Sequence, residues 1–534
     1  MKSQHEIEIK LAGDPYERRR SSSPVAITVI ATPIASALPH PALDRTSRGV
    51  IPHSLDTPEL LTSTAFPWND SYHGDPVAAR RLSAVLVGYE RFYGIDILAS
   101  STSNGISSGM LDSLDSLPLF STNRRGASVE GDELRLCAGS GVPFVDIVRR
   151  FDSFGEQSVE QVRGGIPYLT NEFWTARQRQ AHSIHEISYR ACFKPQLPEF
   201  FISHLTEPND LVYDPFMGRG TTPVQAALMG RRPAGNDINP LSVLLTRPRL
   251  RPVLLSDIMC VLDSIDWKSG SLDEPDLLAF YSEHTFRQIS ALRRWLLESA
   301  PLDKVPPAAV DWVRMIALNR LTGHSPGYFS VYTLPPNQAV SAQAQRKTNE
   351  QRQQVPPDRD VAKIILKKIR TLLRDGPPPT ESEYVLTTAI ANQTPNIPTA
   401  SVAPVVTSPP FLDIVQYAHD NWLRCWFAGI DVQQVAIAHH RTEAGWQSMV
   451  RDTLTELARV VRPEGHVAFE VGEVRGGRVL LEKLVWDAAE GLPFDRLFVM
   501  VNQQEFTKTA NCWGVENNSK GTNTNRVVVL RRVG

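Results

Sequence analysis

The sequence predicts an α/β protein whose doubly wound, Rossmann-like sheet is interrupted by a helical insertion. Strand and helix patterns alternate over residues 166–254 and again over residues 401–534. Such alternation indicates parallel strands joined by crossover helices. Residues 255–400, between the two stretches, carry helical periodicities punctuated by runs of proline. This pattern indicates inserted helices and not a continuation of the sheet.

The length of 534 residues exceeds that of one ordinary compact domain. We expect four parts. Residues 1–165, rich in Ser and Pro, form an N-terminal region of unknown role that is partly disordered. Residues 166–254 and 401–534 are the two halves of the α/β domain, and residues 255–400 are the insertion between them.

The periodicity of apolar residues, together with glycine and proline at the ends of segments, predicts the individual helices and strands. Strands are predicted at 211–213, 232–235, 402–406, 466–471, 497–502 and 526–531. Helices of the α/β domain are predicted to end at residue 205 and to span 224–229, 446–461 and 478–489. The insertion is predicted to hold helices at 277–297, 308–321 and 361–373.

Composition narrows the possible classes of protein. The formal net charge is -2, so any surface for nucleic acid must be a local patch. The 5 cysteines are scattered without a Cys-x-x-Cys pair, which argues against a zinc site and for a reduced, intracellular protein. The apolar residues of 24–43 are interrupted by prolines, so we expect no membrane span. We therefore expect a cytoplasmic protein without a metal.

A glycine-containing loop, residues 214–222 (DPFMGRGTT), follows the predicted strand 211–213. Open α/β sheets bind ligands at the carboxyl ends of their strands. Gly218 and Gly220 allow the backbone to approach a ligand closely, and Thr221 or Thr222 can cap the next helix. Asp237 ends the second strand, where a carboxylate can accept hydrogen bonds from ribose hydroxyls. The alternative is a tight turn without a ligand.

This loop resembles motif I of the amino-methylating DNA methyltransferases, written DPF-x-G-x-G-T-T. The upstream residues 189–198 (YRACFKPQLP) resemble motif X of the same family. The resemblance implies S-adenosylmethionine as the cofactor. It assigns cofactor contacts to Lys194, Pro195, Asp214, Phe216, Gly218, Gly220, Thr221 and Asp237. Two departures are Arg219 in place of the usual Ser, which could alter the loop slightly, and Asp237 where Glu is common.

A second signature, Ser408-Pro409-Pro410-Phe411, follows the predicted strand 402–406. Consecutive prolines hold the backbone rigid and extended. Ser408 and the proline carbonyls can accept hydrogen bonds from an exocyclic amino group, and Phe411 can stack on an extruded base. The segment resembles motif IV of the same family, and its first residue favours cytosine N4. Adenine N6 stays the alternative, as does an ordinary proline turn.

Methylation at cytosine C5 requires a thiolate nucleophile, which family members carry in a Pro-Cys pair. No cysteine here follows a proline. The expected mechanism is therefore base flipping and direct transfer to nitrogen, with catalysis by Ser408, Pro409, Pro410 and Phe411.

The order of motifs resembles that of relatives whose target-recognition domain lies between the cofactor half and the catalytic half. Basic side chains exceed acidic ones over residues 346–374 of the insertion, which suits a phosphate-binding face. The predicted DNA contacts are Arg346, Lys347, Lys363, Lys367, Lys368 and Arg370. The plainer interpretation is a solvated helix face.

The resemblance implies double-stranded DNA as the partner, with a place at the nucleoid and in a restriction-modification system beside a cognate endonuclease. Two other hypotheses stay open. The same chemistry can act on RNA or on a protein amide, or the chain can be a DNA-binding relative without catalysis. The intact loop and Ser408–Phe411 segment argue against the last of these.

Overall fold

The structure is a computed structural model. It describes strands β1 (His5–Leu11) and β2 (Ile27–Pro33) and residues 142–174, 181–189, 192–333, 339–377, 383–412, 417–435, 440–472, 474–503 and 524–534. The chain divides into two compact units, Met1–Ser128 and Val129–Gly534. In the first unit β1 pairs with β2 in antiparallel fashion, with His5 opposite Pro33.

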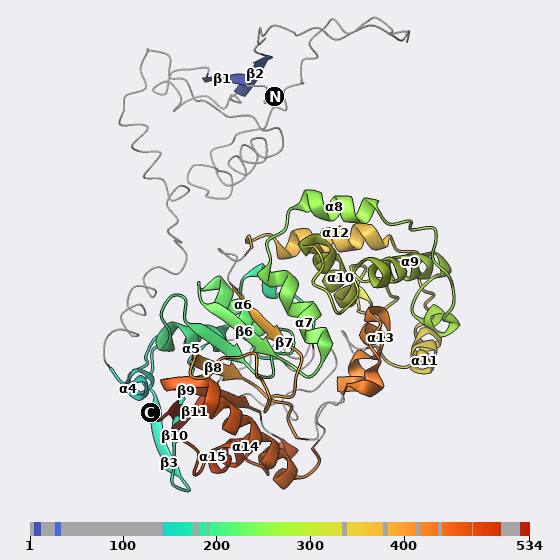
Figure 1. Ribbon diagram of the computed structural model, residues 1–534. Coiled ribbons are helices and arrows are strands. Elements are labelled where there is room, and N and C mark those ends of the chain that lie inside the picture. The colour runs from blue at the N-terminus through green and yellow to red at the C-terminus, as the bar shows by residue number, and fades with distance from the viewer. Residues whose placement is uncertain are drawn as a thin grey trace, which may run out of the picture. The chain divides into compact units, whose positions relative to one another are not determined.

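A 9-stranded sheet organises the second unit, in the order β3-β4-β10-β11-β9-β8-β5-β6-β7 (Figure 1). The strands are β3 (Val159–Arg163), β4 (Ile166–Asn171), β5 (Leu211–Asp214), β6 (Arg232–Asn236), β7 (Val385–Thr387), β8 (Val402–Thr407), β9 (Val461–Val471), β10 (Phe494–Gln503) and β11 (Thr524–Arg532). Strands β9, β8, β5, β6 and β7 are mutually parallel neighbours. Strand β11 runs antiparallel to both β9 and β10.

Both faces of the sheet are buried, and alternate residues of each strand serve different layers. Val405 joins a core formed with helices α14 (Glu443–Val460) and α15 (Leu481–Ala488). Its neighbour Val406 joins an aromatic core formed with α4 (Phe144–Arg149) and α5 (Gln196–Leu205). The predicted doubly wound α/β class is confirmed.

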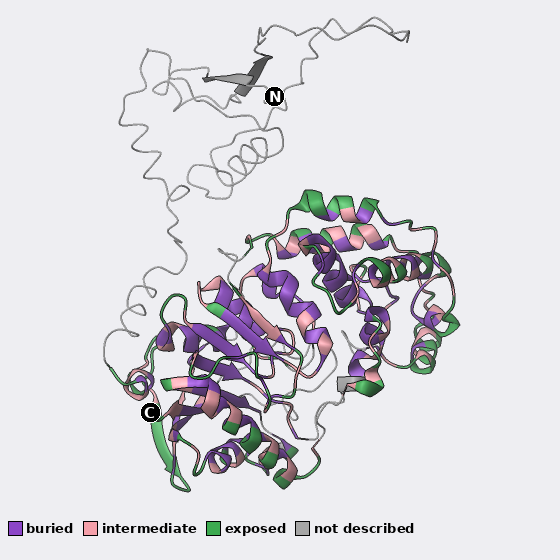
Figure 2. Ribbon diagram, in the orientation of Figure 1, coloured by how far each residue is buried: buried purple, intermediate pink, exposed green. Residues whose placement is uncertain are grey.

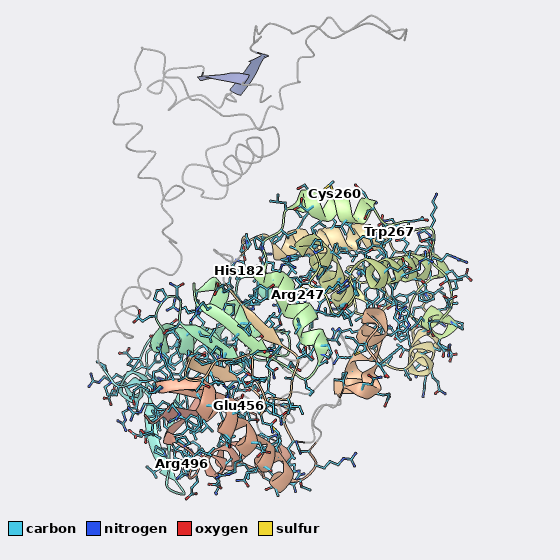
Figure 3. The ribbon with its side chains drawn as sticks, in the orientation of Figure 1. His182, Arg247, Cys260, Trp267, Glu456 and Arg496 are labelled. Carbon is cyan, nitrogen blue, oxygen red and sulfur yellow. The ribbon has the colours of Figure 1, made fainter. Side chains whose placement is uncertain are left out.

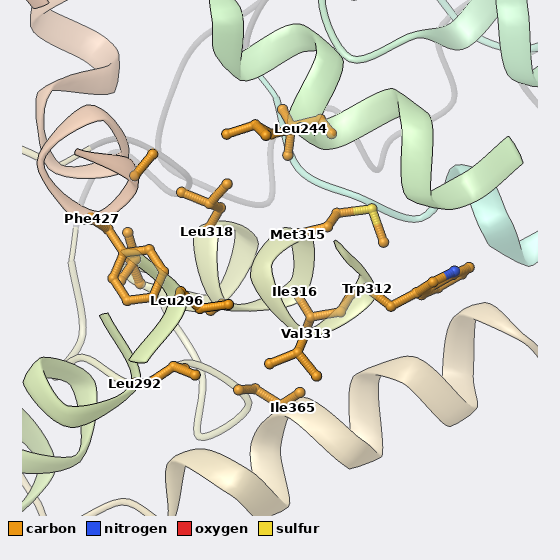
Figure 4. Packing of buried hydrophobic residues seen from close by; sticks show 14 of the residues in the cluster. Leu244, Leu292, Leu296, Trp312, Val313, Met315, Ile316, Leu318, Ile365 and Phe427 are labelled. Carbon is orange, nitrogen blue, oxygen red and sulfur yellow. The ribbon is translucent and has the colours of Figure 1, made fainter. Parts of the chain in front are cut away.

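Most of the helices between β6 and β7 form a compact bundle. They are α7 (Pro240–Thr246), α8 (Leu255–Asp263), α9 (Glu283–Ser299), α10 (Ala308–Arg320), α11 (Ala342–Arg352) and α12 (Val361–Leu372). Helix α10 is buried along its whole length, while the outer side of α8 is exposed (Figure 2). Trp312 and Ile316 of α10 pack in one cluster with Leu244 of α7 and Phe427 of α13 (Tyr417–Ala428) (Figure 4). Helix α7 precedes the inserted residues in the chain and α13 follows them, yet both contribute side chains to the hydrophobic core around α10.

A buried ion pair joins the end of α7 to α10 within the bundle. Arg247, which follows α7 directly and is labelled in Figure 3, donates two hydrogen bonds to Asp311 of α10, at 2.6 and 2.7 Å. Arg251 donates a third to the same carboxylate at 3.2 Å. A buried bidentate pair of this kind fixes orientation more than it adds stability.

The observed elements depart from the predicted ones mainly at boundaries. The hairpin of β3 and β4 spans the predicted boundary at residue 165, because β3 pairs with β4 along its whole length. Strand β7 pairs with β6, so the inserted helices end before residue 385. Helices α4, α7, α8 and α11 were not among the predicted elements, whereas a helix carrying Asn421 and Trp422 was expected and is α13. Among the described residues, no helix is long and apolar enough to cross a membrane.

Candidate active site

The two sequence signatures meet at neighbouring strand ends. Strand β5, which leads into the glycine loop, pairs in parallel with β8, which leads into Ser408. Strand β6 lies on the other side of β5, so the chain reverses its direction of winding at this point, where open sheets bind ligands. Thr407 Oγ1 donates to Asp214 Oδ1 at 2.6 Å. Thr222 Oγ1 donates to the carbonyl of Val406 at 2.9 Å.

The glycine loop is closed by backbone hydrogen bonds. Met217 N donates to Asn236 O at 2.9 Å, and Gly220 N donates to Met217 O at 2.6 Å. Gly218 and Gly220 have φ of 50° and 74°, the left-handed region that favours glycine. A Cβ on Gly220 would overlap with the side chain of Thr246. The loop geometry therefore requires glycine at position 220 for two separate reasons.

The predicted threonine cap of the following helix is wrong. Helix α6 (Thr221–Leu228) has Gly220 at its N-cap position, without a side-chain cap. The left-handed conformation of Gly220 turns the chain directly into the helix. Thr221 is buried and its hydroxyl accepts from Arg219 Nε at 3.2 Å. The Thr222 hydroxyl donates its hydrogen bond to a backbone carbonyl of β8.

Asp237 lies at the end of β6, as predicted for a ribose-binding carboxylate. Its two oxygens accept from Gly218 N at 2.8 Å and from Asn239 N at 2.9 Å. Burial raises the pKa of Asp237, and these two hydrogen bonds oppose the rise. Each carboxylate oxygen keeps a second lone pair for a further donor. The side chain is thus oriented by the loop that it faces.

Asp214 is the buried carboxylate beneath the loop. Its Oδ1 accepts from Thr407 and from Phe216 N at 3.0 Å. Its Oδ2 has no hydrogen-bond partner among the described residues. Burial raises the pKa of Asp214 to about 7, against the effect of the hydrogen bonds from Thr407 and Phe216. Phe216 itself is half-buried and packs against the core beneath α14.

The segment before α5 packs against the glycine loop. Pro195 is the N-cap of α5, and Lys194 before it is largely exposed. The ring of Tyr189 lies 3.6 Å from the position that a Cβ on Gly218 would take. Arg219 donates to the carbonyls of Ile187 at 2.8 Å and Phe193 at 3.4 Å. The Arg found where Ser is usual therefore fastens this segment to the loop.

The Ser408–Phe411 segment is held at both ends. Ser408 is half-buried and follows β8 directly. The Pro410 carbonyl accepts from Trp446 Nε1 at 2.9 Å, which fixes the backbone at this end of the segment. A Cβ on Gly472 would lie 2.5 Å from Phe411 Cε2, which shows that the Phe411 ring rests on this glycine.

Glu470 is a site residue that sequence analysis missed. It is 5% exposed in an otherwise apolar stretch of β9, and its Oε1 accepts from Asn525 Nδ2 at 2.9 Å. Strand pairing places Ser408 beside it, because Thr407 lies opposite Phe469 in the parallel pair of β8 and β9. Burial raises the pKa of Glu470, and the neighbouring Ser408 and Asn525 side chains oppose the rise. The only feature of the sequence that could have identified Glu470 as a site residue is its position as a carboxylate within an apolar strand. No feature of the sequence pointed to Trp446 or Gly472.

Comparisons with known proteins agree with the first signature, the glycine loop. Residues 156–245 match the N6/N4 methyltransferase family model described as DNA methylase. The Type II methyltransferase M.MjaII of Methanocaldococcus jannaschii is 40% identical over 75 residues, which are 14% of this chain and 14% of that relative. Residues 156–245 of this chain are therefore similar to the amino-methylating DNA methyltransferases. The cofactor of this chain is S-adenosylmethionine.

Two solved structures are also similar to this chain. TrmN from Thermus thermophilus shares 12% identity with a TM-score of 0.26, covering 66% of this chain and 52% of TrmN. TTHA0409 from Thermus thermophilus, in complex with S-adenosyl-L-methionine, shares 22% identity with a TM-score of 0.18, covering 27% of this chain and 54% of that one.

The residues of the glycine loop fit S-adenosylmethionine. Asp237 presents free lone pairs where ribose hydroxyls are expected, and Gly218 leaves the loop surface without a side chain. The unpartnered Oδ2 of Asp214 is an acceptor that suits a cationic group with N–H donors.

The predicted DNA contacts fall on two separate helices of the insertion, α11 and α12. Lys363, Lys367 and Arg370 are exposed on one side of α12, spaced as neighbours on a helix. Lys368 turns inward to Glu186, 3.6 Å away, and burial lowers its pKa to about 8. Arg346 and Lys347 are exposed on α11, which packs on residues 275–279 and not on α12. Arg346 pairs there with Asp276.

Proposed function

We propose that this protein transfers a methyl group from S-adenosylmethionine to the exocyclic N4 of cytosine in double-stranded DNA. The hydrogen bond between Thr407 and Asp214 carries the proposal. It joins the glycine loop to the Ser408–Phe411 segment at adjacent strand ends, although 193 residues separate its two partners in the sequence. A cofactor site and a base-binding segment are therefore neighbours, as direct transfer requires.

Each side chain has one role in the proposed reaction. Bound S-adenosylmethionine supplies an electrophilic methyl group. Ser408 and the carbonyl of Pro409 accept hydrogen bonds from the target amino group and so orient its lone pair. Phe411 stacks on the flipped base. The bond from Trp446 to the Pro410 carbonyl fixes the backbone that holds these groups.

The preference for cytosine rests on Ser408, where adenine-specific relatives more often carry Asp. A hydroxyl accepts a hydrogen bond from an amino group without adding a charge next to the base. The chemistry of the site would serve adenine N6 as well, so this base is the alternative outcome of the test.

DNA binding is proposed for the exposed side of α12. Lys363, Lys367 and Arg370 present three positive charges there, and only the surface pair of Lys363 with Asp360, at 3.5 Å, weakens one of them. Phosphate contacts of this kind give affinity without sequence preference. We assign target recognition to the inserted helices, and we expect an intracellular protein at the nucleoid with a cognate restriction endonuclease as its partner.

The test is methyl incorporation from tritiated S-adenosylmethionine into unmethylated genomic DNA, followed by mass spectrometry of the nucleosides. N4-methylcytosine that is lost in Ser408→Ala and Asp237→Ala is the expected result. N6-methyladenine would overturn the assignment of the base and keep the chemistry. Cofactor binding without any methylated DNA base would contradict the proposed substrate.

A matched variant tests the DNA surface. Replacing Lys363, Lys367 and Arg370 together by Gln should weaken DNA binding and lower the dependence of log Kd on log salt by about 3 units, because each lost phosphate contact removes about one. The control replaces Arg346 and Lys347 on α11. An equal loss in the control would contradict the assignment to α12.

A further inference from the structure

Three polar groups from different strands converge under the Ser408–Phe411 segment. Side chains two residues apart on a strand lie on the same face. Val406, Ala468 and Val527 pack in one core, on the face covered by α4 and α5. Ser408 and Glu470 lie two residues beyond Val406 and Ala468, and Asn525 lies two before Val527, so all three face the same layer.

A carboxylate at the position of Glu470 lowers the stability of the fold. It is 5% exposed, and within the described part of the chain no basic side chain forms an ion pair with it. Its observed partner is Asn525, whose amide donates at 2.9 Å, and the pairing of Thr407 with Phe469 places Ser408 next to it on the neighbouring strand. A buried carboxylate that lacks a counter-charge destabilises a fold. An apolar residue or Gln would serve a purely structural role in β9 at lower cost.

We propose that Glu470 is a positioning residue for methyl transfer, an inference that rests on the proposed function. Its carboxylate accepts the hydrogen bond of the Ser408 hydroxyl, so the lone pairs of Ser408 Oγ are left to face the target amino group. Asn525 fixes the carboxylate from the other side. The strand β9 thus orients Ser408 through Glu470 and supports Phe411 through Gly472.

The same arrangement gives the released proton a destination. Methylation of an amino group breaks one N–H bond, and that proton passes to Ser408 Oγ. The Ser408 O–H proton passes at the same time to the Glu470 carboxylate, which becomes neutral. Burial favours the neutral form of this carboxyl group, as its raised pKa indicates. No charge then accumulates on the serine.

The deciding variant is Glu470→Gln in the full-length protein, which removes the charge and keeps the shape. We expect kcat for methyl incorporation into genomic DNA to fall by roughly 100-fold, with KM for DNA within about twofold of the wild type. Glu470→Asp, which keeps a carboxylate, should restore part of the rate. Cofactor binding, measured by calorimetry, should be unchanged because Glu470 lies outside the glycine loop.

The pH profile separates this role from a structural one. Only the ionised carboxylate accepts the proton, so the wild-type rate should rise as pH increases through the raised pKa of Glu470, and this rise should be absent in Glu470→Gln. The unfolding midpoint of Glu470→Gln at pH 8 should equal or exceed that of the wild type, because a buried charge is gone.

Glu482→Gln is the matched control. Glu482 is also buried, but it pairs with Arg526 and does not contact Ser408. Its replacement should lower stability and leave the pH profile unchanged. Wild-type kcat and pH profile in Glu470→Gln would overturn the inference alone. An absence of methyl incorporation by the wild type would overturn the proposed function instead.

Discussion

The glycine loop and the Ser408–Phe411 segment both expose backbone at a strand end, but they are rigid for opposite reasons. Residues 214–222 use glycines, and their shape is imposed by hydrogen bonds from neighbouring backbone and from Arg219. The Ser408–Phe411 segment uses prolines, which are stiff by themselves, and is then held by the hydrogen bond from Trp446 to the Pro410 carbonyl. Changes in the loop should therefore affect folding and cofactor binding, whereas changes around the prolines should affect the rate.

The largest effect is expected at Gly220. Gly220→Ala places a Cβ in the left-handed region and against Thr246, so the free energy of unfolding should fall by about 3 kcal/mol and cofactor binding should be lost. Gly230→Ala is the control, because Gly230 has φ of 73° and nothing within 4 Å of its Cβ position. This control should cost only about 1 kcal/mol. Urea denaturation measures both, and equal losses would contradict the predicted clash.

A pH-dependent effect is expected at Asp214. Its pKa is raised from 3.8 to about 7, so the folded state binds the proton more tightly than the unfolded chain. Ionisation of Asp214 therefore reduces wild-type stability as pH rises from about 4 to 7. Asp214→Asn should gain roughly 2 kcal/mol relative to the wild type across this window, while its cofactor binding weakens. Thermal unfolding at several pH values measures the gain, and a pH-independent difference would disprove it.

A smaller effect on folding is expected at Gly472, where a change should affect the rate and leave cofactor binding intact, unlike a change in the glycine loop. Gly472→Ala pushes the Phe411 ring aside, and the ring can shift, so the loss of stability should be about 1 kcal/mol. The methylation rate should nevertheless fall about tenfold, since the stacking surface for the base moves. Cofactor affinity should be retained. A parallel loss of cofactor binding would show that the two segments are not separable.

The smallest effect on stability is expected at Trp446. Trp446→Phe removes the donor to the Pro410 carbonyl and should cost about 0.5 to 1 kcal/mol, with a severalfold loss of rate. Trp422→Phe is matched to it, because Trp422 Nε1 donates to the carbonyl of Ala339 at 2.9 Å within the helical core. This control should lose similar stability and keep its rate. Equal rates in the two variants would contradict the role of Trp446.

The same two segments show how far the sequence could lead. Strand β5, the loop and Asp237 are consecutive or nearly so, and a local pattern of glycines and a carboxylate sufficed to predict them. Glu470 and Asn525 come near Ser408 only through the pairing of β8 with β9 and of β9 with β11, and Trp446 reaches Pro410 from helix α14. No spacing in the chain encodes that pairing, so these residues could not be predicted.

The insertion shows a similar limit. Periodicity predicted α9, α10 and α12, whose apolar residues repeat on one side. It could not show that the basic stretch from Arg346 to Arg370 divides between two helices with different neighbours. Nor could it show that Lys368 is drawn to Glu186, because that contact joins segments far apart in the chain.

The shared core of the inserted helices limits how this protein could be re-engineered. Leu423 and Phe427 of α13 are buried in the same cluster as Trp312 of α10, yet α13 follows the Ser408–Phe411 segment in the chain. A chimera that exchanged only residues 255–384 for those of a relative would leave the buried side of α13 against a foreign surface. Recognition modules of this architecture should therefore be exchangeable only as a discontinuous unit that includes Tyr417–Ala428.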